Sequence, residues 1–339
     1  MSADPNSNLV VPAEWAPQKA IWTAWPCDAD EWNGDLASPR ADIAAMIRAL
    51  HATTPVKLLV NGPEARRTAE EAVGSAATIV DARYGDVWLR DTGPIFARDG
   101  ASKVALRFKT NSWGGKYDLP DDAIVGDTIA EKAGVAVRRF SFVLEGGAVE
   151  HDGEGTVMTT RQTLLNPNRN GWNREQAEAG LRQAFNARAI VWIDEGLKND
   201  HTDGHIDNIA RFVAPGKVVC QAPAGPDDPN AKTLDAIARV LEQAKDAAGR
   251  KLEVVRIPGV GLYRNALGEV SPASHMNFIV GNGVVVVPVY GTPTQDKALA
   301  ALQSVFPDRR IVGVSSKGLL GAGEAGGGSF HCITQQEPA

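Results

Sequence analysis

The chain has 339 residues, of which 43% are hydrophobic and 22% are charged, and its formal net charge is -6. This composition is typical of a globular protein with a full hydrophobic core, and the acidic balance disfavours a nucleic-acid-binding surface. Three cysteines without a CxxC pair disfavour a disulfide framework or a zinc ribbon, and the longest apolar run, residues 284–289, is too short to cross a bilayer.

The first elements predicted along the chain follow apolar periodicity and turn residues. Residues 1–11 are polar and expected to be loose, and no signal peptide is recognised there. The next segments are predicted to be a strand at 19–26, a helix at 39–51, a strand at 55–60, a helix at 64–73 and a strand at 77–81.

From Asp86 onward the predicted unit is a polar loop, a hairpin, a helix and a strand, and it recurs. The predicted helices lie at 121–132, 174–185, 233–248 and 295–306, and each is followed by a strand. The loop residues Asp91, Glu145, His205, His275 and Cys332 are separated by 54, 60, 70 and 57 residues. Units of this size predict a propeller-like array.

Four complete units leave an unpaired strand at each end of the chain. One is the strand at 21–25, and the other is a segment with strand character at 330–334 that carries Cys332. Pairing the two would close a ring of five units. Because equivalent positions in a ring lie equally far from its axis, we expect Asp91, Glu145, His205, Asp207 and Cys332 to meet in one pocket.

Those residue types suit one kind of chemistry. His205 and Asp207 would leave the same face of a strand, and a histidine beside a thiol activates cysteine as a nucleophile. Carboxylates bind a guanidinium in bidentate fashion, and its positive charge would favour the thiolate of Cys332. The pattern predicts a nucleophilic cysteine acting on a planar cation.

Each of these residues also has a structural interpretation. A lone cysteine is more often a buried packing residue, and a lone acid is more often a turn cap. His201 and His205 could be metal ligands on a helix, but Gly204 and the strand-like residues after it disfavour that helix. Cys27 and Cys220 are interpreted as packing residues, and His331 as structural because it would lie on the opposite strand face.

Six ordered motifs resemble the agmatine deiminases of the guanidino-group-modifying superfamily. They are WLRDTGP at 88–94, NSWGGKY at 111–117, LEGG at 144–147, LNPNRN at 165–170, GHIDN at 204–208, and GGG at 326–328 with HCITQQ at 331–336. The resemblance implies a single catalytic domain over residues 1–339, folded as a five-bladed α/β propeller of ββαβ units.

It also implies a cofactor-free hydrolysis with a cysteine nucleophile, in which Cys332 attacks the guanidinium carbon. Asp91 and Asp207 would hold the guanidinium nitrogens, His205 would protonate the departing ammonia and activate water, and Glu145 would orient His205. Other substrate contacts are expected from Trp88, Trp113, Asp200 and Gly327, and no metal is expected.

Substrate identity stays open at this stage. The loop at 196–202 is shorter and less acidic than the commoner version in that family, and it would contact the far amine of agmatine. Arginine or peptidyl-arginine is the alternative substrate, with Arg90 and Arg169 as the candidates for a carboxylate partner. A metal-dependent hydrolase and a non-catalytic binding propeller are the rival interpretations.

The partner expected is a small cationic guanidino compound rather than nucleic acid or a membrane. The resemblance implies a cytoplasmic protein of putrescine biosynthesis, and a homo-dimer or homo-tetramer is compatible with the sequence.

Overall fold

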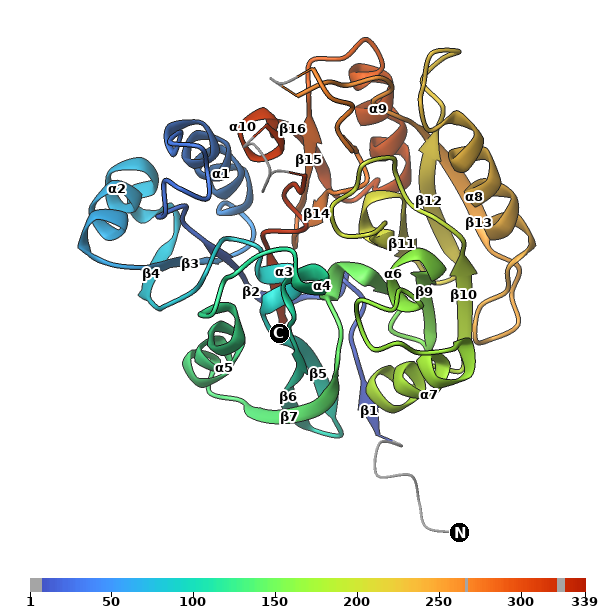
Figure 1. Ribbon diagram of the computed structural model, residues 1–339, viewed down its shortest axis with the longest axis horizontal. Helices are drawn as coiled ribbons and strands as arrows, with labels where there is room; N and C mark the ends of the chain where they lie inside the picture. Colours follow the sequence, from blue (N-terminus) through green and yellow to red (C-terminus); the bar gives the residue numbers. More distant parts are fainter. Residues whose placement is uncertain (1–7, 266–267, 322–326) are drawn as a thin grey trace.

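The structure is a computed structural model that describes residues 8–265, 268–321 and 327–339, and these residues form five sheets arranged as a ring (Figure 1). In each sheet one strand pairs with an antiparallel and a parallel neighbour, and the parallel partner follows after a helix. This is the ββαβ unit, and the predicted five-bladed α/β propeller is confirmed.

The five blades follow one another around the ring in the order of their helices along the chain. The first holds β17 (Gln335–Pro338), β2 (Gln18–Ala24), β3 (Val56–Val60) and β4 (Thr78–Asp81), with α1 (Ala37–Leu50) and α2 (Pro63–Val73). The second holds β1 (Leu9–Val10), β5 (Ile95–Asp99), β6 (Ser102–Lys109) and β7 (Ala136–Val143), with α5 (Asp122–Ala133). The third holds β8 (Val149–His151), β9 (Thr156–Thr160) and β10 (Ala189–Ile193), with α7 (Arg174–Phe185).

The fourth holds β11 (Ala210–Ala214), β12 (Lys217–Ala222) and β13 (Glu253–Pro258), with α8 (Ala231–Gln243), and the fifth holds β14 (Ile279–Val280), β15 (Val284–Val289) and β16 (Arg310–Ser315), with α9 (Gln295–Val305). Short helices lie in the loops: α3 (Leu89–Thr92), α4 (Ser112–Gly115), α6 (Arg161–Leu164), α10 (Lys317–Leu320) and the 3₁₀ turns η1 (Gly74–Ala76), η2 (Gly146–Ala148) and η3 (Ile206–Asn208).

Local sequence explains how these elements begin, end and pack. Asn173 caps α7 with a capping box to Gln176, and Gly134 ends α5 in the left-handed conformation that glycine adopts without strain. The run of valines in β15 is almost wholly buried because strands inside an α/β blade are covered on both faces. The apolar core therefore lies between the sheets and their helices.

The ring closes where β17 pairs antiparallel with β2, with Gln335 opposite Trp22. The predicted pairing of the two chain-end segments is confirmed, but the predicted strand at 330–334 is wrong. Residues 330–333 form a turn, in which the backbone amides of Ile333 and Thr334 donate to the carbonyls of Ser329 and His331. Cys332 therefore lies on a turn just before the closing strand.

Glu337 anchors that closing strand. Its side chain is buried and lies 3.0 Å from Lys19 Nζ, 3.2 Å from Lys57 Nζ and 3.4 Å from Lys103 Nζ, and it accepts a hydrogen bond from Trp22 Nε1 at 3.1 Å. Burial would raise the pKa of this carboxyl, but its hydrogen bond from Lys19 and the charge of Lys57 hold it below its usual value.

Two further boundaries differ from prediction. The helix predicted to reach residue 248 ends at Gln243, because Asp246 forms a tight turn in which its side chain accepts from the backbone amides of Ala248 and Arg250. Of residues 1–11, predicted to be loose, 1–7 lie outside the described residues, whereas Leu9 and Val11 are buried and β1 pairs with β5. In the part of the chain that the structure describes, no helix is long and apolar enough to cross a membrane.

We predict that Glu337→Gln lowers the free energy of unfolding by about 2–3 kcal/mol at pH 7, because charge-assisted bonds to a buried group are lost. The folded pKa of Glu337 is lowered, so its contribution is fully present above the unfolded pKa of about 4.3 and is lost as the pH falls through the folded pKa.

Urea unfolding from pH 3 to pH 8 measures this effect. Glu131→Gln, at an exposed position of α5, is the control and should change stability by less than about 0.5 kcal/mol. A difference between wild type and Glu337→Gln that does not shrink at low pH would contradict the assignment.

Candidate active site

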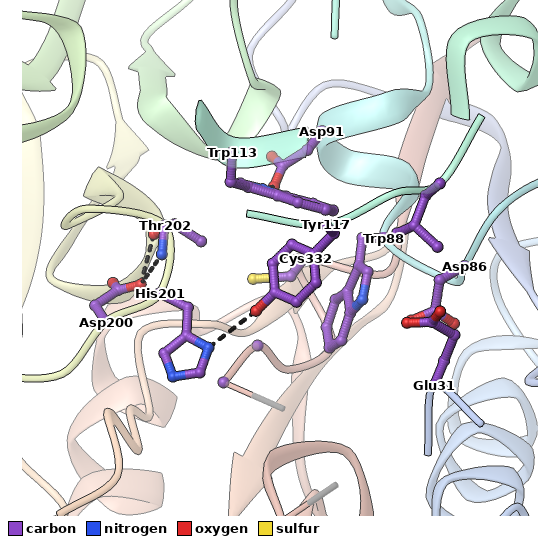
Figure 2. A pocket seen from close by; sticks show the side chains of 13 residues that line it. Glu31, Asp86, Trp88, Asp91, Trp113, Tyr117, Asp200, His201, Thr202 and Cys332 are labelled. Atoms are coloured by element: carbon purple, nitrogen blue, oxygen red, sulfur yellow. Dashed lines mark hydrogen bonds between the residues drawn. The ribbon is translucent and has the colours of Figure 1, made fainter. Parts of the chain in front are cut away.

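A pocket of about 490 Å³ opens beside the turn that carries Cys332 (Figure 2). Six of the residues predicted for the site line this pocket: Trp88, Asp91, Trp113, Asp200, Gly327 and Cys332. They come from α3, α4 and three separate loops. The predicted convergence of these positions is therefore present in the fold.

The other three predicted residues, His205, Asp207 and Glu145, are buried next to this pocket. His205, Asp207 and Asp91 all face Gly147 in η2, where an added Cβ atom would lie 2.5 Å from His205 Nδ1, 3.0 Å from Asp207 Oδ2 and 3.1 Å from Asp91 Oδ1. Glu145 precedes η2, and its Oε2 is 3.9 Å from His205 Nε2. The bare backbone of Gly147 leaves the space in which these side chains meet.

The predicted reason for the nearness of His205 and Asp207 is wrong. They do not alternate along a strand, because His205 precedes the 3₁₀ turn η3 that contains Asp207, and β11 begins only at Ala210. Gly204 has φ +83° and Thr202 Oγ1 accepts from the His205 amide at 3.1 Å, which turns the chain at this point. A turn, rather than a strand face, brings the two side chains to one site.

Asp91 is buried and held by two donors. Trp113 Nε1 donates to its Oδ2 at 2.8 Å, and the Gly147 amide donates to its Oδ1 at 2.9 Å. Trp113 is held in the left-handed region, with φ 53°, a strained conformation that persists where the surroundings enforce it. Burial raises the pKa of Asp91, and the positive charge of His205 lowers it only in part, so the pKa stays above its ordinary value.

His205 is fully buried, and within the described structure neither ring nitrogen has a hydrogen-bond partner. Its Nδ1 lies 3.8 Å from Asp91 Oδ2, beyond hydrogen-bond distance. Burial alone would lower the pKa of His205, but Asp91, Glu145 and Asp207 outweigh it and raise the pKa to about 9. The imidazole is thus cationic at neutral pH, with both N–H groups available.

Besides lying near His205, Glu145 forms an ion pair with Arg169. Arg169 Nε donates to Glu145 Oε1 at 2.7 Å, and Arg169 also pairs with Asp203 at 2.6 Å. Burial would raise the pKa of Glu145, but His205 and Arg169 together lower it. Glu145 is therefore an ionised carboxylate fixed beside His205, which fits the predicted orienting role.

Cys332 is buried and faces two polar side chains. Asn277 Nδ2 donates to its Sγ at 3.1 Å, and the thiol donates to Asp207 Oδ2 at 3.6 Å. Burial, then the negative charges of Asp207 and Asp91, raise the pKa of the Cys332 thiol well above its ordinary value. Cys332 is therefore a neutral thiol beside carboxylates.

The outer pocket is built from aromatic rings. Trp88 stacks on Trp32 with ring centroids 6.0 Å apart, and a Cβ atom on Gly328 would lie 2.4 Å from the Trp88 ring. Tyr117 meets His201 Nδ1 at 3.0 Å across the opening (Figure 2). Gly326, the first glycine of the GGG motif, lies outside the described residues, whereas Gly327 and Gly328 line the pocket.

Asp200 lines the pocket but is engaged within its own loop. Its Oδ1 accepts from the amide and hydroxyl of Thr202, and its Oδ2 accepts from Asn208 Nδ2 at 3.2 Å. Among the described residues, no group of three or more histidine, cysteine, aspartate or glutamate side chains is placed to hold a metal ion.

The sequence profile of the Porphyromonas-type peptidyl-arginine deiminases matches residues 10–338. The chain belongs to this family. It is 36% identical to an agmatine deiminase of Ectopseudomonas mendocina, over 97% of this chain and 95% of that protein.

Solved structures agree with the family assignment. The agmatine deiminase of Enterococcus faecalis superposes with a TM-score of 0.92 at 29% identity and covers 100% of this chain and 98% of its own. DDAH from Pseudomonas aeruginosa, at 14% identity and a TM-score of 0.54 over 94% of this chain and 99% of its own, shares the fold alone. This deiminase is therefore a hydrolase that acts on a guanidino carbon–nitrogen bond.

Sequence reasoning missed several residues of the deiminase site. Asn277 contacts Cys332 Sγ, His331 contacts Asp207, and Glu31 and Asp86 line the pocket. Asn277 follows His275 in the repeating polar loop, so the repeat that located Asp91 and His205 could have found it. The strand predicted at 330–334 places His331 on the face opposite Cys332, whereas the turn in the structure brings its ring to Asp207.

We predict that Gly147→Ala reduces guanidino hydrolysis by at least about a hundredfold, because its methyl group would displace the side chains that meet there. Initial rates on a guanidino substrate measure this loss. Gly225→Ala, where an added Cβ meets nothing within 4 Å, is the control and should keep wild-type rates. Full activity of Gly147→Ala would show that His205, Asp207 and Asp91 do not act together.

Proposed function

We propose that this deiminase hydrolyses agmatine to N-carbamoylputrescine and ammonia. The observation that carries the proposal is the charge of the pocket. No lysine or arginine of the described residues lines it, whereas Glu31 and Asp86 do. Such a pocket suits a substrate with a guanidinium at one end and an ammonium at the other, and it disfavours the carboxylate of free arginine.

The two arginines considered as carboxylate partners are committed elsewhere. Arg90 is buried and donates to the His331 carbonyl and to the side chains of Gln335 and Gln336. Arg169 is paired with Glu145 and Asp203, and its side chain is 1% exposed. The relatives named agmatine deiminases support the same choice.

Asp86 and Glu31 lie on the far side of Trp88 from Cys332 (Figure 2). Asp86 is buried, its Oδ1 accepts from Trp32 Nε1 at 3.0 Å, and its Oδ2 has no hydrogen-bond partner among the described residues. Burial raises the pKa of Asp86 to about 7, and burial also raises the pKa of Glu31. In our proposal the substrate ammonium supplies the missing partner.

The proposed chemistry begins with guanidinium binding. Asp91 and Asp207 bind its nitrogens, with Asp207 Oδ1, which has no partner within the described structure, as one free acceptor. The bound cation lowers the cost of forming the Cys332 thiolate, because it offsets the carboxylates that disfavour ionisation. Substrate binding is thus coupled to activation of the nucleophile.

The thiolate then attacks the guanidinium carbon, and a tetrahedral intermediate forms. Cationic His205 donates a proton to one nitrogen, and the carbon–nitrogen bond breaks to release ammonia. An S-alkylthiouronium remains on Cys332. His205, now neutral, takes a proton from water, and the hydroxide adds to the same carbon. The carbon–sulfur bond then breaks and the hydroxyl proton passes to the departing sulfur, which gives the neutral ureido product and the free thiol.

The proposal also covers the cellular compartment, the domain organisation and the oligomeric state. A free catalytic thiol suits a reducing compartment such as the cytoplasm, and residues 1–339 would act as one catalytic domain without nucleic acid. A homo-dimer or homo-tetramer is compatible with it.

We predict that Cys332→Ser lowers agmatine turnover by at least about 10⁴-fold, because a serine hydroxyl is a far weaker nucleophile than a thiolate. Carbamoylputrescine and citrulline are measured with agmatine, arginine and a blocked peptidyl-arginine side by side. Wild-type protein that forms no carbamoylputrescine would contradict the substrate assignment. Cys220→Ser, at a buried thiol of β12, is the control for loss of a thiol and should keep activity.

A covalent intermediate should also be visible. Intact-mass spectrometry after rapid acid quenching should show the mass of the thiouronium adduct on the wild type and no adduct on Cys332→Ser. An adduct on Cys332→Ser would contradict the covalent route. So would an active wild-type protein that shows no adduct at any quench time.

We predict that Asp86→Asn raises KM for agmatine about tenfold or more with a smaller change in kcat, because the ammonium loses its buried partner. Since the pKa of Asp86 is raised to about 7, wild-type KM should also rise as the pH falls below 7. Asp30→Asn, at an exposed neighbouring acid, is the control. An equal KM for Asp86→Asn and wild type would contradict the proposed contact between Asp86 and the ammonium group of agmatine.

A further inference from the structure

His331 lies between two carboxylates although it does not line the substrate pocket. Its Nδ1 is 2.7 Å from Asp207 Oδ2, and its Nε2 is 3.0 Å from Glu14 Oε2. The residue is only 2% exposed, so water does not compete for these contacts. The sequence position next to Cys332 does not by itself indicate such an arrangement.

The two contacts define the charge of the ring. A neutral imidazole carries one N–H, so one of its nitrogens would face a carboxylate with a lone pair. Both contacts are hydrogen bonds only if both nitrogens are protonated. Glu14 accepts from Arg211 and from the Val280 amide. Burial would raise the pKa of Glu14, but the charge of Arg211, followed by that of His331, lowers it.

The surrounding charges favour the same state. His331 interacts electrostatically with the carboxylates of Glu14, Glu150 and Asp207 and with the imidazole of His151. Arg90 donates to the His331 carbonyl, Arg211 pairs with Glu14 and Glu150, and His205 acts on Asp207. Burial lowers the pKa of His151 to about 4, so it is neutral at pH 7. The carboxylates of Glu14 and Asp207 both contact the ring, so a cationic His331 pairs with two buried negative groups.

The backbone of His331 is fixed as firmly as its ring. Asn277 Oδ1 accepts from the amides of both His331, at 2.9 Å, and Cys332, at 3.2 Å, while its Nδ2 donates to Cys332 Sγ. The Asn277 side chain thus fixes two neighbouring residues, His331, whose ring contacts Asp207, and the nucleophile Cys332.

We propose that His331 is a positioning residue for guanidino hydrolysis: as a buried imidazolium held by Glu14, it keeps Asp207 ionised and turns Asp207 Oδ1 toward the substrate guanidinium. The inference rests on the proposed function for its substrate. Asp207 Oδ2 is then occupied by His331, which explains why one oxygen of this carboxylate has a partner and the other has none within the described residues.

The test is agmatine binding in a Cys332→Ala background, which removes the thiol from the titration. Isothermal calorimetry from pH 4 to pH 8 compares Cys332→Ala with Cys332→Ala/His331→Gln. The pKa of Asp207 is held below its ordinary value, and loss of the adjacent positive charge raises it, so the loss of affinity in the double variant should be largest at pH 4. The deficit should shrink as the pH rises and Asp207 ionises. A purely structural role would give a deficit independent of pH.

His275→Gln in the same background is the matched control. His275 is also fully buried, but its Nδ1 meets the Pro288 carbonyl instead of a carboxylate, so its loss should leave the pH dependence of binding unchanged. An equal pH-dependent deficit in His275→Gln, or no change of affinity in the His331 variant, would overturn the inference.

Nitrogen-15 NMR of histidine-labelled wild-type protein keeps the inference testable if His331→Gln fails to fold. Two protonated ring nitrogens on His331 at pH 7.5 are expected, and a ring with one unprotonated nitrogen would overturn it. Failure of the proposed function is distinguishable, because it appears as wild-type protein that does not turn over agmatine, whatever the charge of His331.

Discussion

The constraint on which this site depends is the burial of several carboxylates around one thiol. Asp91, Glu145 and Asp207 are all at least 90% shielded from water, and an ionised carboxylate in such a place is stable only with a partner. Each has one: Trp113 for Asp91, Arg169 for Glu145 and His331 for Asp207. Among the described residues, both ring nitrogens of His205, Glu145 Oε2 and Asp207 Oδ1 have no hydrogen-bond partner. In the proposed reaction the guanidinium and the proton transfers would use these groups.

This arrangement sets the order of events in the proposed reaction. The carboxylates favour a cationic His205 and a neutral Cys332. In the proposed reaction a positively charged substrate would offset these carboxylates and so lower the cost of forming the Cys332 thiolate. The enzyme would therefore hold little reactive thiolate until substrate is present, and the same charge that is recognised also activates the nucleophile.

Much of the fold was predictable from the sequence because the blades repeat. Helix α7 has the predicted bounds, since a capping asparagine marks its start, and strand β10 follows it as predicted, with a β-branched run. The turn at Cys332 was not predictable in this way: Phe330, Cys332 and Thr334 alternate as a strand would, and only the side-chain and backbone bonds of Thr334 to residues 330 and 331 show the turn. Charge partners such as Arg169 and Glu14 come from distant loops, and periodicity carries no information about them.

Ring closure also has a consequence for how the protein folds. Trp22 Nε1 bonds Glu337 across a separation of 315 positions in the chain, so the blade that joins the chain ends depends on highly non-local contacts. Contacts of this kind form late, because the loop entropy they cost is offset only when the other blades are in place. Cys332 immediately precedes this strand, so the nucleophile meets its carboxylates at one of the last steps of assembly. Catalytic activity then reports the completely folded ring, and intermediates with four formed blades would carry the thiol without its site.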